Sequence, residues 1–254
     1  MKQYAMIIDL NRCVGCHACA VACRAEWDIP TKEGYRRNWV RSLGPATTSK
    51  GVSFTSYPGL CNHCDHPACV PVCPADQIDK TFTEAKTSKT VTMKVAATWK
   101  DPFDGTVQID KSRCLGCGAC AQACPYGARY VNTDIANKDL GGEGIADKCT
   151  FCQPRVEAGL PPACVQTCIS DARIFGRLDD PQIAGYIKNG ALRLQSANVK
   201  IGPNVYYAGA PKDLELLATT STPQKMPQEA NLRRRFLAGM MKPVMQRIKG
   251  TGLV

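Results

Sequence analysis

Sixteen cysteines, gathered into four short motifs, constrain this 254-residue chain more than any other feature. Two motifs have the spacing C-x2-C-x2-C-x3-C, one has a longer middle gap, and one carries an insertion between C-x2-C and C-x3-C. In chain order they are Cys13, Cys16, Cys19 and Cys23; Cys61, Cys64, Cys69 and Cys73; Cys114, Cys117, Cys120 and Cys124; and Cys149, Cys152, Cys164 and Cys168. Four motifs of four leave no cysteine over.

The C-x2-C-x2-C-x3-C run, followed by proline as at Pro125, is typical of bacterial ferredoxins. Three thiolates on a tight loop wrap three corners of a cuboidal cluster, and glycines such as Gly15, Gly116 and Gly118 let the backbone approach the sulfides. The fourth cysteine then ligates the cluster of a partner motif. We therefore expect two two-cluster units and four 4Fe–4S clusters, with all sixteen cysteines as iron ligands.

Structural zinc is the alternative for these cysteines. Zinc sites typically pair two C-x2-C elements separated by a dozen or more residues. The fourth motif alone resembles that pattern, but two C-x2-C-x2-C-x3-C runs in the same chain do not, so no zinc site is expected. His17, His63 and His66 all lie inside the cysteine loops, where hydrogen bonding or packing is the expected role because four cysteines already serve each cluster.

Short runs rich in β-branched and aromatic residues frame the motifs and predict strands. Residues 4–10 and 106–110 enter motifs one and three, while 128–132 and 172–178 leave motifs three and four. The fold class expected is α+β, with small sheets and much irregular loop. Two insertions, 28–60 and 75–105, separate the motifs. In the second, Val91, Met93 and Val95 alternate with polar residues, which predicts a hairpin or edge strand.

The net charge of +10 first raises the question of nucleic acid. Each oxidised cluster with four thiolates carries roughly −2, so four clusters bring the chain to about +2. The basic excess then compensates buried anionic clusters, and no nucleic-acid partner is expected. Basic residues that flank the cysteine loops are either solvated or raise cluster reduction potentials; they are Arg12, Arg24, Lys111, Arg113, Arg129 and Lys148.

The order of the motifs, with LCNHCDHPAC at residues 60–69 and DKCTFC at 147–152, resembles a known family. It is that of the electron-transfer (beta) subunits of complex iron–sulfur molybdoenzymes, the dimethyl sulfoxide reductase family. The resemblance covers roughly residues 1–185. It implies that the motifs pair first with fourth and second with third, whereas spacing alone leaves first-with-second pairing open. The ligand sets implied are Cys13, Cys16, Cys19 and Cys168; Cys23, Cys149, Cys152 and Cys164; Cys61, Cys64, Cys69 and Cys124; and Cys73, Cys114, Cys117 and Cys120.

The resemblance also implies a function without bond-making chemistry in this chain. Such a subunit relays electrons between a molybdopterin or tungstopterin catalytic subunit and a quinone-reactive membrane subunit, and it is not an enzyme on its own. It implies tandem ferredoxin-like modules, one formed by residues 1–60 and 140–210 and the other by 61–139. The chain would be peripheral to the membrane through its partners, on the cytoplasmic side or, if co-exported, the periplasmic side. A freestanding polyferredoxin is the alternative.

The expected C-terminal tail, residues 211–254, lacks cysteine and becomes strongly basic. Residues 231–254 contain six lysines and arginines and no acidic residue, with apolar residues at helical spacing. We consider two interpretations, docking on a partner or an anionic lipid surface, and a solvated extension. The Arg-Arg-Arg-Phe-Leu run resembles a twin-arginine signal, but such signals are N-terminal. Residues 1–10 do not resemble a signal peptide, and no apolar run is long enough for a membrane span.

Overall fold

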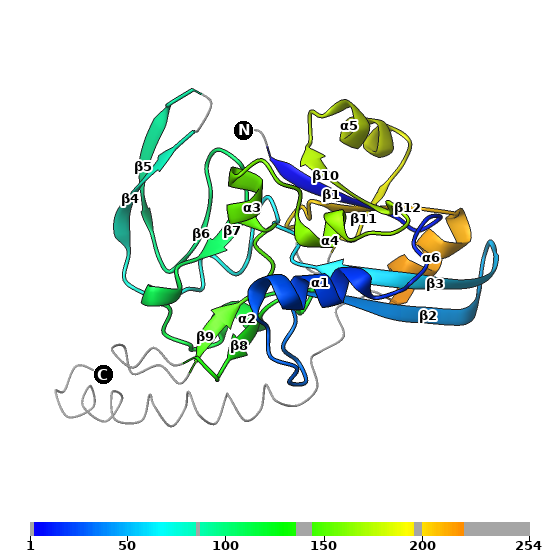
Figure 1. The fold of residues 1–254 in the computed structure, drawn as a ribbon, viewed down its shortest axis with the longest axis horizontal. Helices are drawn as coiled ribbons and strands as arrows, with labels where there is room; N and C mark the ends of the chain where they lie inside the picture. The colour runs from blue at the N-terminus through cyan, green and yellow to red at the C-terminus, as the bar shows by residue number, and fades with distance from the viewer. Residues whose placement is uncertain (1–2, 85–86, 136–143, 196–199, 221–254) are drawn as a thin grey trace. The chain divides into compact units, whose positions relative to one another are not determined.

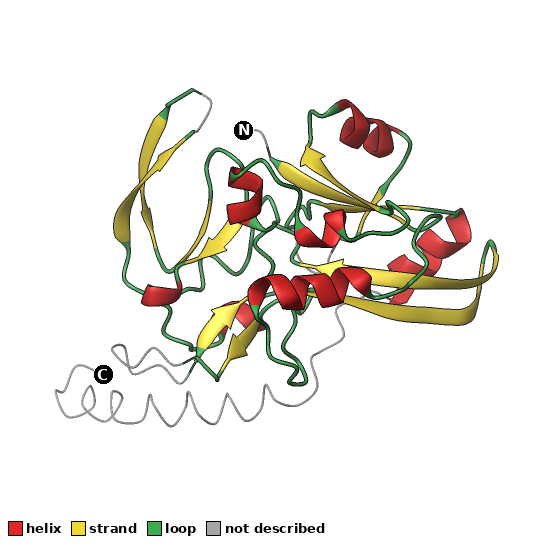
Figure 2. Ribbon diagram, viewed as in Figure 1, coloured by secondary structure: helices red, strands yellow, loops and turns green. Residues whose placement is uncertain are grey.

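The computed structural model describes residues 3–84, 87–135, 144–195 and 200–220. Within these ranges helices and strands are mixed, as an α+β chain requires, and long loops connect them (Figures 1 and 2). The strands are β1 (Tyr4–Asp9), β2 (Asn38–Thr48), β3 (Gly51–Leu60), β4 (Ile78–Thr83), β5 (Thr90–Val95), β6 (Thr98–Lys100), β7 (Val107–Ile109), β8 (Tyr130–Asn132), β9 (Ile145–Asp147), β10 (Arg173–Arg177), β11 (Leu192–Arg193) and β12 (Val205–Ala208). The helices are α1 (Ala18–Trp27), η1 (Lys111–Arg113), α2 (Ala119–Gln122), α3 (Gln153–Glu157), α4 (Ala163–Gln166), α5 (Pro181–Lys188) and α6 (Pro211–Thr220).

The largest sheet in the described residues has the strand order β10-β1-β12-β11. Strand β1 runs antiparallel to β10 and parallel to β12. Its sequence, YAMIID, is almost continuously apolar, as expected of a strand covered on both faces. The strands predicted at 4–10 and 172–178 are thus confirmed, and β1 enters motif one while β10 leaves motif four. Motifs far apart in the chain therefore meet at one pair of strands.

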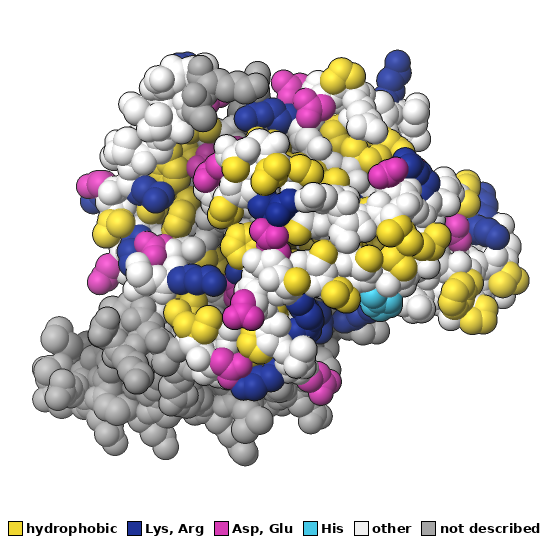
Figure 3. Space-filling model, viewed as in Figure 1, with side chains coloured by type: hydrophobic (Ala, Val, Ile, Leu, Met, Phe, Trp, Pro, Cys, Tyr) yellow, Lys and Arg dark blue, Asp and Glu magenta, His cyan; other side chains and the backbone are white. Residues whose placement is uncertain are grey.

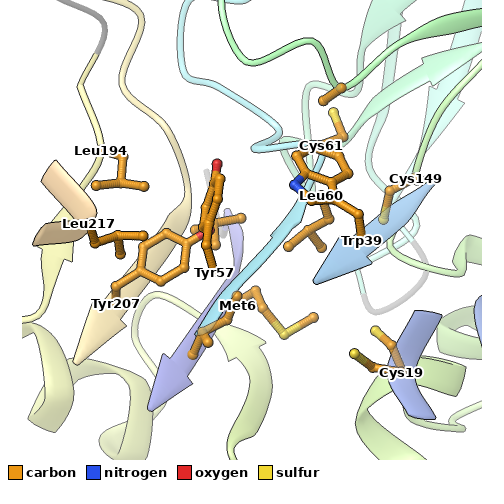
Figure 4. Packing of buried hydrophobic residues seen from close by; sticks show 14 of the residues in the cluster. Met6, Cys19, Trp39, Tyr57, Leu60, Cys61, Cys149, Leu194, Tyr207 and Leu217 are labelled. Atoms are coloured by element: carbon orange, nitrogen blue, oxygen red, sulfur yellow. The ribbon is translucent and has the colours of Figure 1, made fainter. Parts of the chain in front are cut away.

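The alternation of side chains along β1 divides the interior into two cores. Met6 and Ile8 point into the core that contains cysteines, while Ala5 and Ile7 pack with Ile183 of α5 on the other face. Figure 4 shows Met6 near Leu60 and Tyr57, with Cys19, Cys61 and Cys149 around the same core. Strand β1 thus separates the cysteine-containing core from the layer covered by α5.

The insertion at 28–60 contains a long regular hairpin, β2–β3, that the sequence analysis did not predict. A register shift between Leu43 and Ala46 interrupts the ladder, and Gly44 there has φ of 92°, a conformation that favours glycine. The hairpin is anchored by its buried base, where Trp39 and Tyr57 join the cysteine-containing core. Residues 211–220, the start of the expected tail, form α6, which packs on β2 and β3 through Leu216 and Leu217.

Three two-stranded sheets account for the remaining strands in the described ranges: β4–β5, β6–β7 and β8–β9. They contain the strands expected near 90–98, 106–110 and 128–132, so these predictions are confirmed. The β4–β5 hairpin extends away from the rest of the fold in Figure 1. Val91 and Met93 remain 41% and 39% exposed, whereas Val95 at the base is buried. The alternation of apolar and polar residues thus predicted strand β5 correctly, although only the base of β5 is buried.

A buried ion pair connects the segment before β2 to β9. The Arg37 guanidinium donates to both Asp147 carboxylate oxygens, at 2.8 and 2.7 Å, and the Tyr130 hydroxyl donates to the same carboxylate at 2.5 Å. Arg37 is 2% exposed, and its guanidinium carbon lies 4.2 Å from the centre of the Trp27 ring. This bidentate pair joins residues 110 positions apart in the chain.

Residues 231–254, for which docking or a solvated extension was considered, lie outside the described residues. Within the part of the chain that is described, no helix is long and apolar enough to cross a membrane.

The Arg37–Asp147 pair generates a stability prediction. Asp147→Ala leaves a buried guanidinium without its carboxylate and is expected to lower the free energy of unfolding by about 3–5 kcal/mol. Glu26→Ala is the matched control, because Glu26 pairs with Arg155 at the surface at 3.1 Å and its loss is expected to cost below about 1 kcal/mol. Anaerobic urea unfolding followed by circular dichroism compares the two. Equal shifts would show that the buried pair contributes no more than the exposed one.

The loop of motif three generates a second prediction, because Gly116 has φ of 65° and lies against the backbone of Gly144. A methyl group at Gly116 would overlap the Gly144 carbonyl oxygen, so Gly116→Ala is expected to prevent this loop from closing and to lower bound iron per chain. Gly159→Ala is the control, since Gly159 has a similar φ of 77° but no atom within 4 Å of the added methyl. The measurement is the iron content per chain of the two variants. Equal iron in both would contradict the predicted role of the Gly116–Gly144 contact.

Candidate iron–sulfur sites

Motifs one and four meet through two helices. Cys19 and Cys23 lie one turn apart on α1, and Cys164 lies on α4, which packs against α1. Helix α1 begins after His17, a residue with φ of 63°, and the same loop contains Gly15 at 67°. Positive φ values tighten the loop, so that its cysteines and backbone N–H groups turn toward one place. Strand pairing between β1 and β10 brings Cys13 and Cys168 to the same end of the sheet.

Two interior cavities are each lined by four cysteines. One is lined by Cys23, Cys149, Cys152 and Cys164, together with Arg37 and Phe151. The other is lined by Cys73, Cys114, Cys117 and Cys120, together with Pro74 and Leu115. Each cavity takes one cysteine from one motif and three from another. In the first cavity, Cys23 is more than a hundred positions away from the other three cysteines in the sequence, and folding brings the four together.

The remaining cysteines are close enough to influence one another electrostatically. Burial raises the pKa of Cys13, and the charges of Cys19 and Cys168 add to this effect. Burial also raises the pKa of Cys64, with contributions from Cys61, Cys124 and Cys69. Cys16 lies on the loop between Cys13 and Cys19 and is exposed.

The donor set fits iron–sulfur clusters. All sixteen cysteines are free thiols, and ten of them are buried. Burial raises the pKa of the Cys164 and Cys124 thiols to about 11, so a positive partner is needed to keep them as thiolates. Iron supplies that charge, because a coordinated thiol is deprotonated. In the described ranges no three His, Cys, Asp or Glu side chains converge on a single ion. Each of the two cavities is instead lined by four cysteines, the number that ligates one cuboidal cluster.

Backbone N–H groups are directed at several of the sulfurs, a common feature of iron–sulfur sites. Ala146 donates to Cys114 Sγ at 3.3 Å, Phe151 to Cys149 Sγ at 3.4 Å, and Ala172 to Cys168 Sγ at 3.3 Å. Burial alone would raise the pKa of Cys168, but backbone N–H contacts from Arg173, Ala172 and Ser170 hold it below its ordinary value. At Cys168 the backbone therefore stabilises negative charge on sulfur.

The four groups of cysteines differ in exposure. Cys23, Cys149, Cys152 and Cys164 are all buried, and Cys16 is exposed. The partly exposed cysteines are Cys13, Cys73, Cys117, Cys124 and Cys168. The apolar side chains of Val14 and Val21 in the segment of motif one, and of Ile169 next to Cys168, are 66%, 64% and 75% exposed. Figure 3 shows apolar, basic and acidic side chains interspersed on the face that it presents.

The basic residues that flank the motifs separate into two classes. Arg12 pairs with Asp171 at the surface at 3.5 Å, and Arg24 donates to the Tyr35 carbonyl oxygen at 2.7 Å. Arg129 and Lys148, by contrast, are 2% and 0% exposed. A third buried cation, Arg173, lies at the start of β10 and was not singled out from the sequence. Its only sequence signal was a lone arginine at the edge of an apolar run.

His63 has the hydrogen-bonding and packing role expected from the sequence. It is fully buried, stacks on Phe151 with ring centres 3.8 Å apart, and its Nδ1 accepts the Val107 N–H at 2.9 Å. Burial, with Lys148 and Arg129 nearby, lowers the pKa of His63 well below its ordinary value, so the ring is neutral. His17 instead marks the start of α1.

Comparisons with known proteins agree with this donor set. A family model described as a 4Fe–4S dicluster domain matches residues 52–178, and a 4Fe–4S binding domain matches residues 4–25. A tetrathionate reductase subunit of Salmonella typhimurium is 40% identical over 212 residues, covering 82% of this chain and 72% of that protein. The thiosulfate reductase electron transfer subunit of Salmonella typhi is 38% identical over 188 residues, covering 73% and 82%. A putative dimethyl sulfoxide reductase iron–sulfur subunit of Halobacterium salinarum is 36% identical over 199 residues, covering 71% and 68%.

These relatives are iron–sulfur subunits of reductases, and the alignments extend over most of the chain. The two 4Fe–4S family models and the free, grouped cysteines agree with these identities. The chain belongs to the family of electron-transfer (beta) iron–sulfur subunits of the complex iron–sulfur molybdoenzymes.

Proposed function

We propose that this chain relays electrons through four 4Fe–4S clusters between a pterin-containing catalytic subunit and a quinone-reactive membrane subunit. The observation that carries the proposal is that sixteen free cysteines gather in fours, with two cavities each lined by four of them. Each cluster would supply one-electron transfer, with no bond made or broken. The chain's own residues bind and order the clusters and shield them from water.

The ligand sets proposed follow the nested pairing of the motifs. We call them set A (Cys13, Cys16, Cys19 and Cys168), set B (Cys23, Cys149, Cys152 and Cys164), set C (Cys61, Cys64, Cys69 and Cys124) and set D (Cys73, Cys114, Cys117 and Cys120). Sets B and D coincide with the linings of the two cavities. For set A, Cys19 and Cys168 both influence the pKa of Cys13. For set C, Cys61, Cys69 and Cys124 all influence the pKa of Cys64.

Neighbouring cysteines support a linear order of the four sites. Cys19 of set A influences the pKa of Cys164 of set B, and Cys61 of set C influences that of Cys149 of set B. Cys120 of set D influences that of Cys69 of set C. The order A–B–C–D follows, with the fully buried set B in the interior. The partly exposed sets A and D lie at the ends, where electrons would enter and leave.

The same grouping supports two ferredoxin-like modules, residues 1–60 with 140–210 for sets A and B, and 61–139 for sets C and D. Contacts between β1 and β10 and between α1 and α4 join the halves of the first module. The exposed apolar side chains of Val14, Val21 and Ile169, in the segments of motifs one and four, suit a protein partner near set A, because such side chains are covered in complexes. Partner subunits would hold the chain at the membrane, and the substrate would be bound by the catalytic subunit.

The cluster count is tested by chemical analysis of anaerobically purified protein. Four clusters correspond to about sixteen irons and about sixteen acid-labile sulfides per chain, with negligible zinc. An iron content of about eight in fully loaded protein, accompanied by stoichiometric zinc, would rule the proposal out.

The pairing is tested by two cysteine variants at equivalent motif positions. Cys168→Ser is expected to perturb the electron paramagnetic resonance (EPR) signal of the cluster in set A and to leave set C loaded. Cys124→Ser is the reciprocal control and is expected to perturb set C alone. If Cys168→Ser instead removes the cluster built on Cys61, the nested pairing is wrong.

A further inference from the structure

Buried cations lie where two of the cysteine groups meet. Arg173, at the start of β10, is 4% exposed, and its strongest thiol neighbours are Cys164 of set B and Cys19 of set A. Arg129, just before β8, is 2% exposed and has Cys69 of set C and Cys120 of set D as its strongest thiol neighbours. Arg173 also donates to Asn38, which lines the cavity of set B, and Arg129 donates to Thr98, which lines the cavity of set D, so each arginine lies close to both sites of one proposed module.

A third buried basic side chain, Lys148, lies near cysteines of both set B and set C. Lys148 is fully buried, and its Nζ donates to the Val107 carbonyl oxygen and, at 2.7 Å, to that of Cys149. Its thiol neighbours are Cys61 and Cys69 of set C and Cys149 of set B. Along the order A–B–C–D, a basic side chain is thus present at every step. Two carbonyl oxygens accept hydrogen bonds from Lys148, so it differs from the two arginines.

These two arginines lack carboxylate partners in the described part of the chain. Arg173 donates to the Asn38 side-chain oxygen at 2.9 Å, and Arg129 donates to the Thr98 hydroxyl at 3.3 Å. Among the described residues, Nη1 of Arg173 and both Nε and Nη2 of Arg129 have no hydrogen-bond partner. A buried guanidinium is costly unless negative charge compensates it.

Arg37 shows what compensation looks like elsewhere in the same interior. It lies beside the thiols of Cys23 and Cys149 but forms two hydrogen bonds with Asp147. For Arg173 and Arg129, the acidic groups at hand are the cysteine thiolates. A guanidinium stays protonated in proteins, so both side chains carry a positive charge.

We propose that Arg173 and Arg129 are positioning residues for electron transfer, each placing one positive charge between two clusters and raising the reduction potentials of both. This inference rests on the proposed four-cluster function. Adding one electron to a cluster makes its site more negative, and a nearby cation stabilises that reduced state more than the oxidised one. The effect is strong in a buried site, where water does not screen it. Arg173 acts on sets A and B, and Arg129 acts on sets C and D.

The test uses the full-length chain, purified anaerobically with its clusters, and four variants: Arg173→Gln, Arg173→Lys, Arg129→Gln and Arg129→Lys. The readouts are iron and sulfide content and the midpoint potential of each cluster in an EPR-monitored redox titration. Arg173→Gln is expected to lower two of the four potentials, and Arg129→Gln the complementary two. The lysine variants keep the charge and are expected to shift the same pairs by less than half as much.

Arg177→Gln is the matched control. Arg177 lies on the same strand as Arg173, but its guanidinium carbon is 4.8 Å from the centre of the Tyr4 ring. It is expected to leave all four potentials unchanged.

Unchanged potentials in loaded Arg173→Gln and Arg129→Gln would overturn the inference, as would equal shifts of all four clusters in either variant. If a glutamine variant fails to load its two adjacent clusters, the lysine variant at that position decides. Loss of the same clusters with lysine would assign the guanidinium a role in assembly alone and overturn the inference, whereas a small shift confined to the adjacent pair supports it. Four reducible clusters with unshifted potentials would leave the proposed function standing, so the two failures are distinguishable.

Discussion

The structure depends on burying many thiols in an interior that must also accept their negative charge. Ten of the sixteen cysteines are buried, and they take the places that apolar side chains occupy in ordinary cores. A buried thiol resists ionisation, as the raised pKa values of Cys164 and Cys124 show. Ligation of iron reverses this preference, so cofactor binding and folding are coupled here. The loops, helices and short strands are arranged to meet that demand.

Strand β1 organises the half of the molecule that contains motifs one and four. Its even-numbered residues contribute to the cysteine-containing core and its odd-numbered residues to the layer beneath α5. Pairing with β10 brings the entrance of motif one beside the exit of motif four, and α1 packs on α4 at the same place. The Arg37–Asp147 pair then connects the start of the β2 hairpin to β9. Short helices and strands can form this half of the molecule because each contacts an element that is distant in the sequence.

Charge is distributed to match the proposed path of electrons. Basic residues at the surface, such as Arg12 and Arg155, have carboxylate partners, so their fields are largely neutralised and screened. Arg173 and Arg129 are buried beside thiols instead, and we propose that each positive charge acts on two clusters. Cys16 is exposed, whereas all four cysteines of set B are buried. In the proposed path, set A is therefore more accessible to a partner than set B.

The sequence by itself determined the cofactor class, the iron ligands proposed, the α+β class and four of the framing strands, because cysteine spacing and apolar runs are local signals. The β2–β3 hairpin was missed because residues 28–60 are rich in glycine, proline, serine and threonine, and its pairing depends on the distant α6 and the cysteine-containing core. The pairing of the motifs was left open by spacing alone, and the tertiary contacts between β1 and β10 and around the two cavities support the nested pairing. The role of Arg173 was likewise invisible, since a single arginine in a strand acquires meaning only when folding places cysteines from two distant motifs on either side of it.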